Sequence, residues 1–218
     1  AHCISQVVVA YEPVWAIGTG KTALMAAAAM ESRRLGLAKK PVIATMKSIL
    51  PGLAADARMF FPGAKILVVE GGLPAEKRKQ MMAQIATGDW DMVLTTHDNL
   101  EAIEVSPERK NAYIQKEIAE IADVIRAAQI EGGADSARIV KDLENAMAKL
   151  YEKLKTTIDE KRRDDSVYFE DMGIDMLFVD EFHEYKTLPV YTTQRGVKGI
   201  PTGKSQQSVD MYMKMGTV

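Results

Sequence analysis

The sequence has little cysteine and little histidine, and each scarcity excludes a kind of site. Cys3 is the single cysteine among 218 residues, so no disulfide within the chain and no cysteine-based zinc site can form. This usage fits a reducing compartment, and we expect a cytoplasmic location. The histidines are His2, His97 and His183, and no two have the i, i+4 spacing of a helical metal site. We therefore expect no histidine-based metal centre.

Long apolar runs and a strong charge excess are also missing. No stretch of about 18 apolar residues could span a bilayer, and the start, AHCISQVVVAYEP, lacks a signal-peptide pattern, so we expect no membrane partner. The formal net charge of -2 gives no bulk reason for tight nucleic-acid binding, although a local basic face stays open. Without an initiator methionine, the chain is expected to be an excised or engineered piece.

Short apolar runs alternate with helix-like segments along most of the chain. The runs expected to be strands are 7–11, 41–45, 65–70, 91–97 and 176–181. The segments expected to be helices are 22–35, 50–61 with an interruption at Pro51, and 74–87. Gly36 is expected to cap the first of them. This alternation predicts an α/β fold, with a mainly parallel sheet covered by helices on both faces.

One block, residues 107–165, breaks this alternation because it is long, charged and without strand signals. Apolar residues recur there at helical spacing in two series, Ile114, Ile118, Ile121 and Ile125, then Ile139, Leu143, Met147, Leu150, Leu154 and Ile158. Two such helices joined at a Gly-Gly turn predict an antiparallel hairpin inserted into a domain made of 1–106 and 166–218. Two interpretations are open: the two helices could be solvated and pack only against each other, or the hairpin could bind a partner or nucleic acid.

A glycine-rich loop lies between the first predicted strand and the first predicted helix. It reads Gly18, Thr19, Gly20, Lys21 and Thr22. Glycines let backbone N–H groups approach phosphate oxygens, and the helix N-terminus favours an anion. Lys21 would contact the β- and γ-phosphates of a nucleotide, and the Thr22 hydroxyl would bind Mg²⁺. The strict phosphate-loop pattern has glycine where this chain has Trp15, so only the looser G-x-G-K-T form is met.

A second motif, MLFVDEFHEYK, ends a predicted strand in two carboxylates. Asp180 would hold Mg²⁺, and Glu181 would orient and deprotonate the water that attacks the γ-phosphate. Both motifs are expected at the carboxyl edge of the sheet, where catalysis in α/β folds takes place. The alternative is an acidic strand end that only faces solvent.

From about Gly18 onward the chain resembles the first RecA-like lobe of a superfamily 2, Snf-type DNA helicase, and most closely the helicase–methylase proteins of phages and mobile elements. The matching stretches include GTGKTALMAAAAMESRRLGLAKKPVIA, IATGDWDMVLTTHDNLEAI and DMLFVDEFHEYKTLP. The resemblance implies a three-layer P-loop NTPase fold, ATP as the nucleotide and double-stranded DNA as a partner. It places Thr45, Lys47, Thr95 and Thr96 in segments that contact the DNA backbone, although these residues are also ordinary at strand ends.

The same resemblance assigns an arginine finger to a second RecA-like lobe. Such a finger contributes about 10³ to 10⁵ in rate to phosphoryl transfer. We therefore expect this chain to bind Mg-ATP and to hydrolyse it weakly or not at all without that lobe.

A second resemblance covers the start of the chain. The stretch VVVAYEPVWAIGTGKTA is similar to the sixth strand and mobile loop of triosephosphate isomerase, in which the position of Glu12 is the catalytic base. Trp15 could stack on a base or pack into the core. Three interpretations stay open: a helicase lobe, an engineered chimera or scaffold without catalysis, and a phosphate-binding loop of the isomerase type.

Overall fold

The computed structural model describes residues 7–9, 20–132, 134–159, 167–192 and 205–218. The chain divides into two compact units. The sheet unit comprises 1–104, 167–186 and 210–218, and the hairpin unit comprises 105–166 and 187–209. Each unit is treated by itself below.

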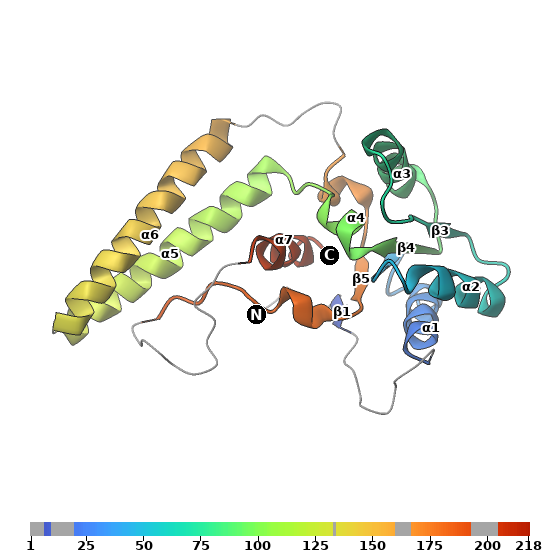
Figure 1. Cartoon of the computed structure of the whole chain (residues 1–218), viewed down its shortest axis with the longest axis horizontal. Coiled ribbons are helices and arrows are strands. Elements are labelled where there is room, and N and C mark those ends of the chain that lie inside the picture. Colours follow the sequence, from blue (N-terminus) through green and yellow to red (C-terminus); the bar gives the residue numbers. More distant parts are fainter. Residues whose placement is uncertain (1–6, 10–19, 133, 160–166, 193–204) are drawn as a thin grey trace. The chain divides into compact units, whose positions relative to one another are not determined.

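The sheet unit is built on five parallel strands (Figure 1). They are β1 (Val7–Val9), β2 (Pro41–Thr45), β3 (Ile66–Val68), β4 (Met92–Thr96) and β5 (Met176–Val179). Their spatial order is β1-β5-β2-β4-β3, so β5, although last in sequence, lies between β1 and β2. All five predicted strands are present, and most are shorter than predicted. The last residue of the predicted run 91–97, His97, instead begins a helix.

Both faces of the sheet are buried, which explains why the strands are continuous apolar runs rather than alternating ones. Neighbouring residues of one strand point to opposite faces: Val42 and Ala44 belong to one core cluster, and Ile43 belongs to the other. Strand β5 is divided in the same way, with Leu177 and Phe178 on opposite faces. The sheet is therefore the middle of three layers.

Helices α1 (Gly20–Arg34) and α2 (Leu50–Phe60) cover one face. Their contribution to that core is mainly Met25, Ala26, Ala29, Leu50, Leu53, Ala54 and Ala57. The predicted interruption of the second helix at Pro51 is wrong. Proline occupies the first turn of α2, where its missing N–H would have no partner in the helix, and the helix continues through it.

Gly36 follows α1 with a φ of 73°, and its N–H donates to the Arg33 carbonyl at 3.0 Å. The predicted glycine cap of the first helix is therefore confirmed, because glycine adopts this left-handed backbone without strain from a side chain.

The other face is covered by α3 (Ala75–Thr87), the short α4 (His97–Glu101), the 3₁₀ turn η1 (Phe169–Met172) and the end of α7 (Gln206–Met215). Lys214 on α7 is fully buried there, and it donates to the Leu100 carbonyl at 2.6 Å and to Asp210 at 2.5 Å. Burial lowers the pKa of Lys214, although Asp210 opposes this shift. One buried ammonium group therefore holds the carboxyl end of α4 against α7.

The hairpin unit contains the two longest helices of the described chain, α5 (Pro107–Glu131) and α6 (Ala134–Asp159), which lie along each other in Figure 1. Their seam contains four isoleucines of α5 and Leu150 of α6 as its buried core. Gly132 ends α5 with a φ of 67°. The predicted hairpin between the fourth and fifth strands is confirmed.

A buried polar contact accompanies the apolar seam. Glu117 of α5 is almost fully buried, and the Tyr191 hydroxyl donates to its carboxylate at 3.1 Å. Residues 187–192, which belong to the same unit, are thereby attached to α5.

These elements form the three-layer, RecA-like α/β arrangement that the sequence predicts. No helix in the described part is long and apolar enough to cross a membrane.

Leu53 provides a test of the α2 face of the core, where it is fully buried. We expect Leu53→Ala to lower the free energy of unfolding by about 2–5 kcal/mol, through lost burial and the cavity left behind. Met59→Ala on the same helix is the control: Met59 is 65 % exposed, and its truncation should change stability by less than about 0.5 kcal/mol. Urea unfolding followed by circular dichroism measures both, and equal effects would contradict this packing.

Candidate functional site

Strand β5 ends in the predicted acidic pair, and the structure buries the first member. Asp180 directly follows the buried strand and is 4 % exposed. Its N–H donates to the Ala44 carbonyl at 2.9 Å, which extends the pairing of β5 with β2 by one residue. The sequence alternative of an acidic strand end that simply faces solvent does not describe Asp180.

The carboxylate of Asp180 is held on both oxygens. The Thr45 hydroxyl donates to Oδ2 at 2.9 Å, and the Glu181 N–H donates to Oδ1 at 3.1 Å. Each oxygen keeps a second lone pair, because an ionised carboxylate has about four acceptor positions.

Glu181 has an unusual backbone conformation. Its φ of 51° and ψ of 41° make it the sole non-glycine residue with positive φ in the described part. Left-handed backbone is unfavourable for a residue with a Cβ, and such strain gathers at functional sites. The turn re-aims the chain after β5, and the Glu181 carboxylate lies 3.0 Å from Nδ1 of His183.

The strand that precedes the glycine-rich loop in sequence, β1, ends at the same edge of the sheet. Strand β1 pairs with β5 so that Val9 lies opposite Val179, the residue before Asp180. Helix α1 begins at Gly20, which places Lys21 and Thr22 in its first turn. Gly18 and Thr19 lie outside the described residues, as do Glu12, Trp15 and the side-chain position of Lys21. The parallel topology thus directs the end of β1, after which the loop comes, to the edge that carries Asp180.

A cavity of about 140 Å³ opens at this edge, beside the ends of β2 and β4. It is lined by Thr45, Met46, Lys47, Thr96, His97, Asp98 and Glu184. The lining brings together three segments that are far apart in sequence: the residues after β2, the start of α4, and the 3₁₀ turn η2 (Phe182–Tyr185) that follows the acidic pair.

The glycine pair after β3 supports this cavity, and the sequence analysis did not single it out. A Cβ on Gly71 would lie 3.2 Å from Cδ of Lys47 and from Cγ2 of Thr96. Gly72 has a φ of 80°, and a Cβ there would lie 3.2 Å from the Lys47 ammonium. The Lys47 side chain therefore lies against a turn that only glycine fits closely. Two consecutive glycines after a strand were the available signal.

His97 is buried behind this edge, 7 % exposed, and sequence reasoning did not give it a role. Its ring stacks on Tyr185 at a centroid distance of 5.7 Å, and Nδ1 lies 2.9 Å from the Tyr185 hydroxyl. The same hydroxyl also lies 3.3 Å from the Glu101 carboxylate. Nε2 of His97 is buried with no hydrogen-bond partner within the described part.

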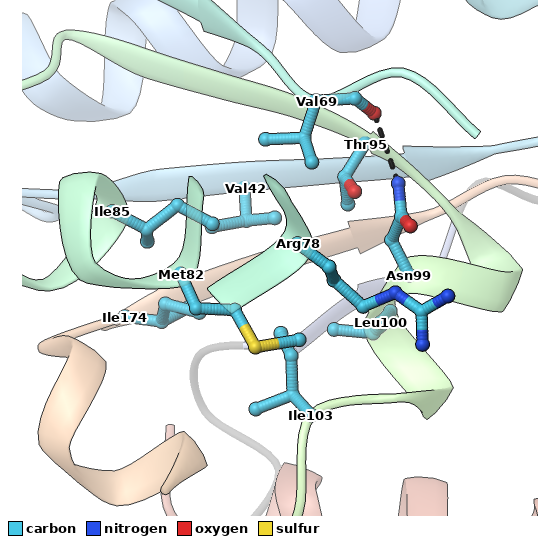
Figure 2. A pocket seen from close by; sticks show the side chains of 10 residues that line it. All are labelled: Val42, Val69, Arg78, Met82, Ile85, Thr95, Asn99, Leu100, Ile103 and Ile174. Carbon is cyan, nitrogen blue, oxygen red and sulfur yellow. Dashed lines mark hydrogen bonds between the residues drawn. The ribbon is translucent and has the colours of Figure 1, made fainter. Parts of the chain in front are cut away.

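Thr95 lines a second, smaller cavity in the interior of the sheet unit. Figure 2 shows its lining, in which Arg78 and Asn99 are the polar companions of Thr95 among apolar side chains. The Asn99 amide donates to the Val69 carbonyl at 3.1 Å and to the Glu70 carbonyl at 2.9 Å, which secures the end of β3. The space is about 10 Å³, room for about one water molecule. Thr95 therefore lies in the interior, and the expected contact with DNA does not fit it.

Comparison with known proteins gives two separate findings. A family model described as a probable helicase domain matches residues 13–218. A stretch of 22 residues is 96% identical to triosephosphate isomerase of Albidiferax ferrireducens and 86% identical to that of Paracidovorax citrulli. Each of these matches covers 10% of this chain and 9% of the isomerase, so the chain spans less than a tenth of these curated relatives. No solved structure matches the chain.

The Tyr185 hydroxyl can be tested by its removal. Tyr185→Phe should lower the free energy of unfolding by about 1–3 kcal/mol, because Nδ1 of the buried His97 loses its partner. Tyr151→Phe is the matched control: Tyr151 is 52 % exposed, and its change should stay within about 0.5 kcal/mol. Thermal and urea unfolding report the difference, and an unchanged Tyr185→Phe protein would show that this bond contributes nothing.

Proposed function

Because the chain belongs to the family of probable helicase domains, we propose that it is the ATP-binding lobe of a DNA helicase or translocase. The observation that carries the proposal is the buried Asp180 at the carboxyl end of β5, with both carboxylate oxygens oriented by donors. Strand β1, which precedes the glycine-rich loop, ends beside it. An acidic group at the end of one parallel strand and a glycine loop after its neighbour are the two halves of a nucleotide site.

In this proposal the loop residues bind the phosphates. Gly18, Thr19 and Gly20 present backbone N–H groups, and the start of α1 adds unpaired donors. Lys21 contacts the β- and γ-phosphates. Glu181 orients the attacking water and accepts its proton, from a backbone turned sharply after β5.

The donor set at Asp180 fits a magnesium ion. Mg²⁺ prefers oxygen ligands and keeps several waters, so one carboxylate and the Thr22 hydroxyl are sufficient protein ligands beside a nucleotide phosphate. When bound, the ion neutralises the charge that develops on the transferring phosphoryl group. The arginine finger is assigned to a second RecA-like lobe, so this chain acting alone is expected to hydrolyse ATP slowly or not at all.

Isothermal titration with Mg-ATP tests the nucleotide site. We expect measurable binding by the wild type and a loss of at least about 10-fold in affinity for Lys21→Ala, because one charge-assisted phosphate contact is worth about 1.5–3 kcal/mol. Lys77→Ala, on the exposed side of α3, is the control and should bind as the wild type does. If neither the wild type nor Lys21→Ala binds, or both bind equally, the ATP site is refuted and the scaffold interpretation is favoured.

The second part of the proposal is a weak contact with double-stranded DNA at the cavity beside β2 and β4. Lys47 is exposed there and lies against the Gly71–Gly72 turn. An exposed lysine ammonium is suited to contact with backbone phosphate. Asp98 and Glu184 also line the cavity, and their charge limits the affinity.

Fluorescence anisotropy with a labelled duplex tests this contact. We expect weak binding that falls with salt, and Lys47→Ala should reduce the slope of log K against log salt by about 1, because one phosphate contact is lost. Lys77→Ala should leave the slope unchanged. A slope that does not differ between Lys47→Ala and the wild type would remove Lys47 from the interface.

Isomerase catalysis is not favoured by the fold. Triosephosphate isomerase activity belongs to a closed barrel of eight parallel strands. The described strands form an open sheet in the order β1-β5-β2-β4-β3, and the similarity covers 9% of the isomerase. We therefore propose that the short similarity reflects a chimera, in which the two families share one phosphate-binding loop.

A further inference from the structure

Thr45 occupies a position where the chain could equally carry valine. It is the last residue of β2 and is fully buried, with 0 % exposure. The preceding residues of β2 are apolar, and valine has nearly the same shape as threonine and a similar preference for strands. A buried hydroxyl is unfavourable unless it has a hydrogen-bond partner. Packing alone therefore does not account for threonine here.

The partner of the Thr45 hydroxyl is the Asp180 carboxylate, at 2.9 Å from Oδ2. The same two strand ends are joined by the bond from the Asp180 N–H to the Ala44 carbonyl. Side chain and backbone together fix the end of β5 against the end of β2. This role differs from the DNA-backbone contact expected for Thr45 from its place in the sequence.

The two donors act on different oxygens of Asp180, Thr45 on Oδ2 and the Glu181 N–H on Oδ1. Rotation of the carboxylate about its Cβ–Cγ bond would break both bonds. The remaining lone pair of each oxygen is therefore presented in a fixed direction. Donors that hold a ligand carboxylate in this way typically change metal affinity by about 10- to 100-fold.

We propose that Thr45 is a positioning residue for Asp180, whose carboxylate it holds in the orientation that receives the Mg²⁺ of a bound nucleotide. This inference rests on the proposed function. It assigns the end of β2 to the magnesium site.

The test is the effect of magnesium on ATP affinity, measured by titration calorimetry with ATP in the presence of Mg²⁺ and again in EDTA. The ratio of the two dissociation constants reports the metal contribution. Thr45→Val should reduce this ratio by about 10-fold while the affinity in EDTA stays unchanged, because only metal orientation is lost. Thr45→Ser keeps the hydroxyl and should stay within about 2-fold of the wild type.

Three further variants make the outcomes separable. Thr95→Val removes a buried hydroxyl from the neighbouring strand β4, in the small cavity of Figure 2, and should leave the ratio unchanged. Asp180→Asn should abolish the magnesium effect. Thr45→Ala, which also lacks the hydroxyl, replaces Thr45→Val if circular dichroism shows that the valine variant does not fold.

The other possible outcomes contradict either the role of Thr45 or the proposed function. If Asp180→Asn lowers the ratio and the hydroxyl-free variants of Thr45 do not, Thr45 has no positioning role and the proposed function stands. The role is equally overturned if Thr45→Ser is as impaired as Thr45→Val, or if Thr95→Val is impaired to the same extent. If wild type and Asp180→Asn respond identically to magnesium, the metal assignment of the proposed function itself is wrong.

Discussion

The parallel direction of all five strands is the constraint on which the other features of the sheet unit depend. Parallel strands end at one edge, so residues that follow different strands meet there even when they are far apart in sequence. The position of β5 between β1 and β2 places Asp180 at that edge, beside the ends of both strands. Burial on both faces holds the edge rigid, since residues of β2, β3, β4 and β5 belong to the core clusters on both faces of the sheet.

Two hydrogen-bonded groups of polar side chains lie buried at this edge, although Nε2 of His97 has no partner in the described part. Asp180 accepts from Thr45, and His97 bonds to Tyr185, which in turn donates to Glu101. A buried polar group without a partner is strongly unfavourable, and a satisfied network in a low-dielectric interior is rigid. The orientation of the Asp180 carboxylate is therefore set by hydrogen bonds from within the protein.

The glycine-rich sequence Gly18–Thr22 is the element that our proposal places in common between the two families. A strand, a glycine-rich turn and a helix N-terminus form a phosphate site in many contexts, because backbone N–H groups and the helix dipole supply the attraction. Residues 13–218 match the helicase-domain family, and a short stretch matches an isomerase almost completely. The surrounding sheet decides between them, since it supplies the acidic strand end and an open edge in place of a closed barrel.

The sequence by itself determined the strands, most helices and the hairpin, because hydrophobic period and glycine placement are local signals. It also located Asp180 and Glu181 at a strand end. It erred at Pro51, where only the helix boundary decides whether proline interrupts or begins a helix. It missed α4 and α7, which are short or are stabilised by the buried contact of Lys214.

Tertiary structure alone decided which partner each threonine hydroxyl at the strand ends has. Thr45, Thr95 and Thr96 are alike in sequence, yet one bonds to Asp180, one lies in an interior cavity and one caps α4 by accepting from the Asn99 N–H. The pairing of β2 with β5 makes this difference, and it joins residues 135 positions apart. A pattern read along the chain reports which face a side chain takes, whereas its partner is set by which strands become neighbours.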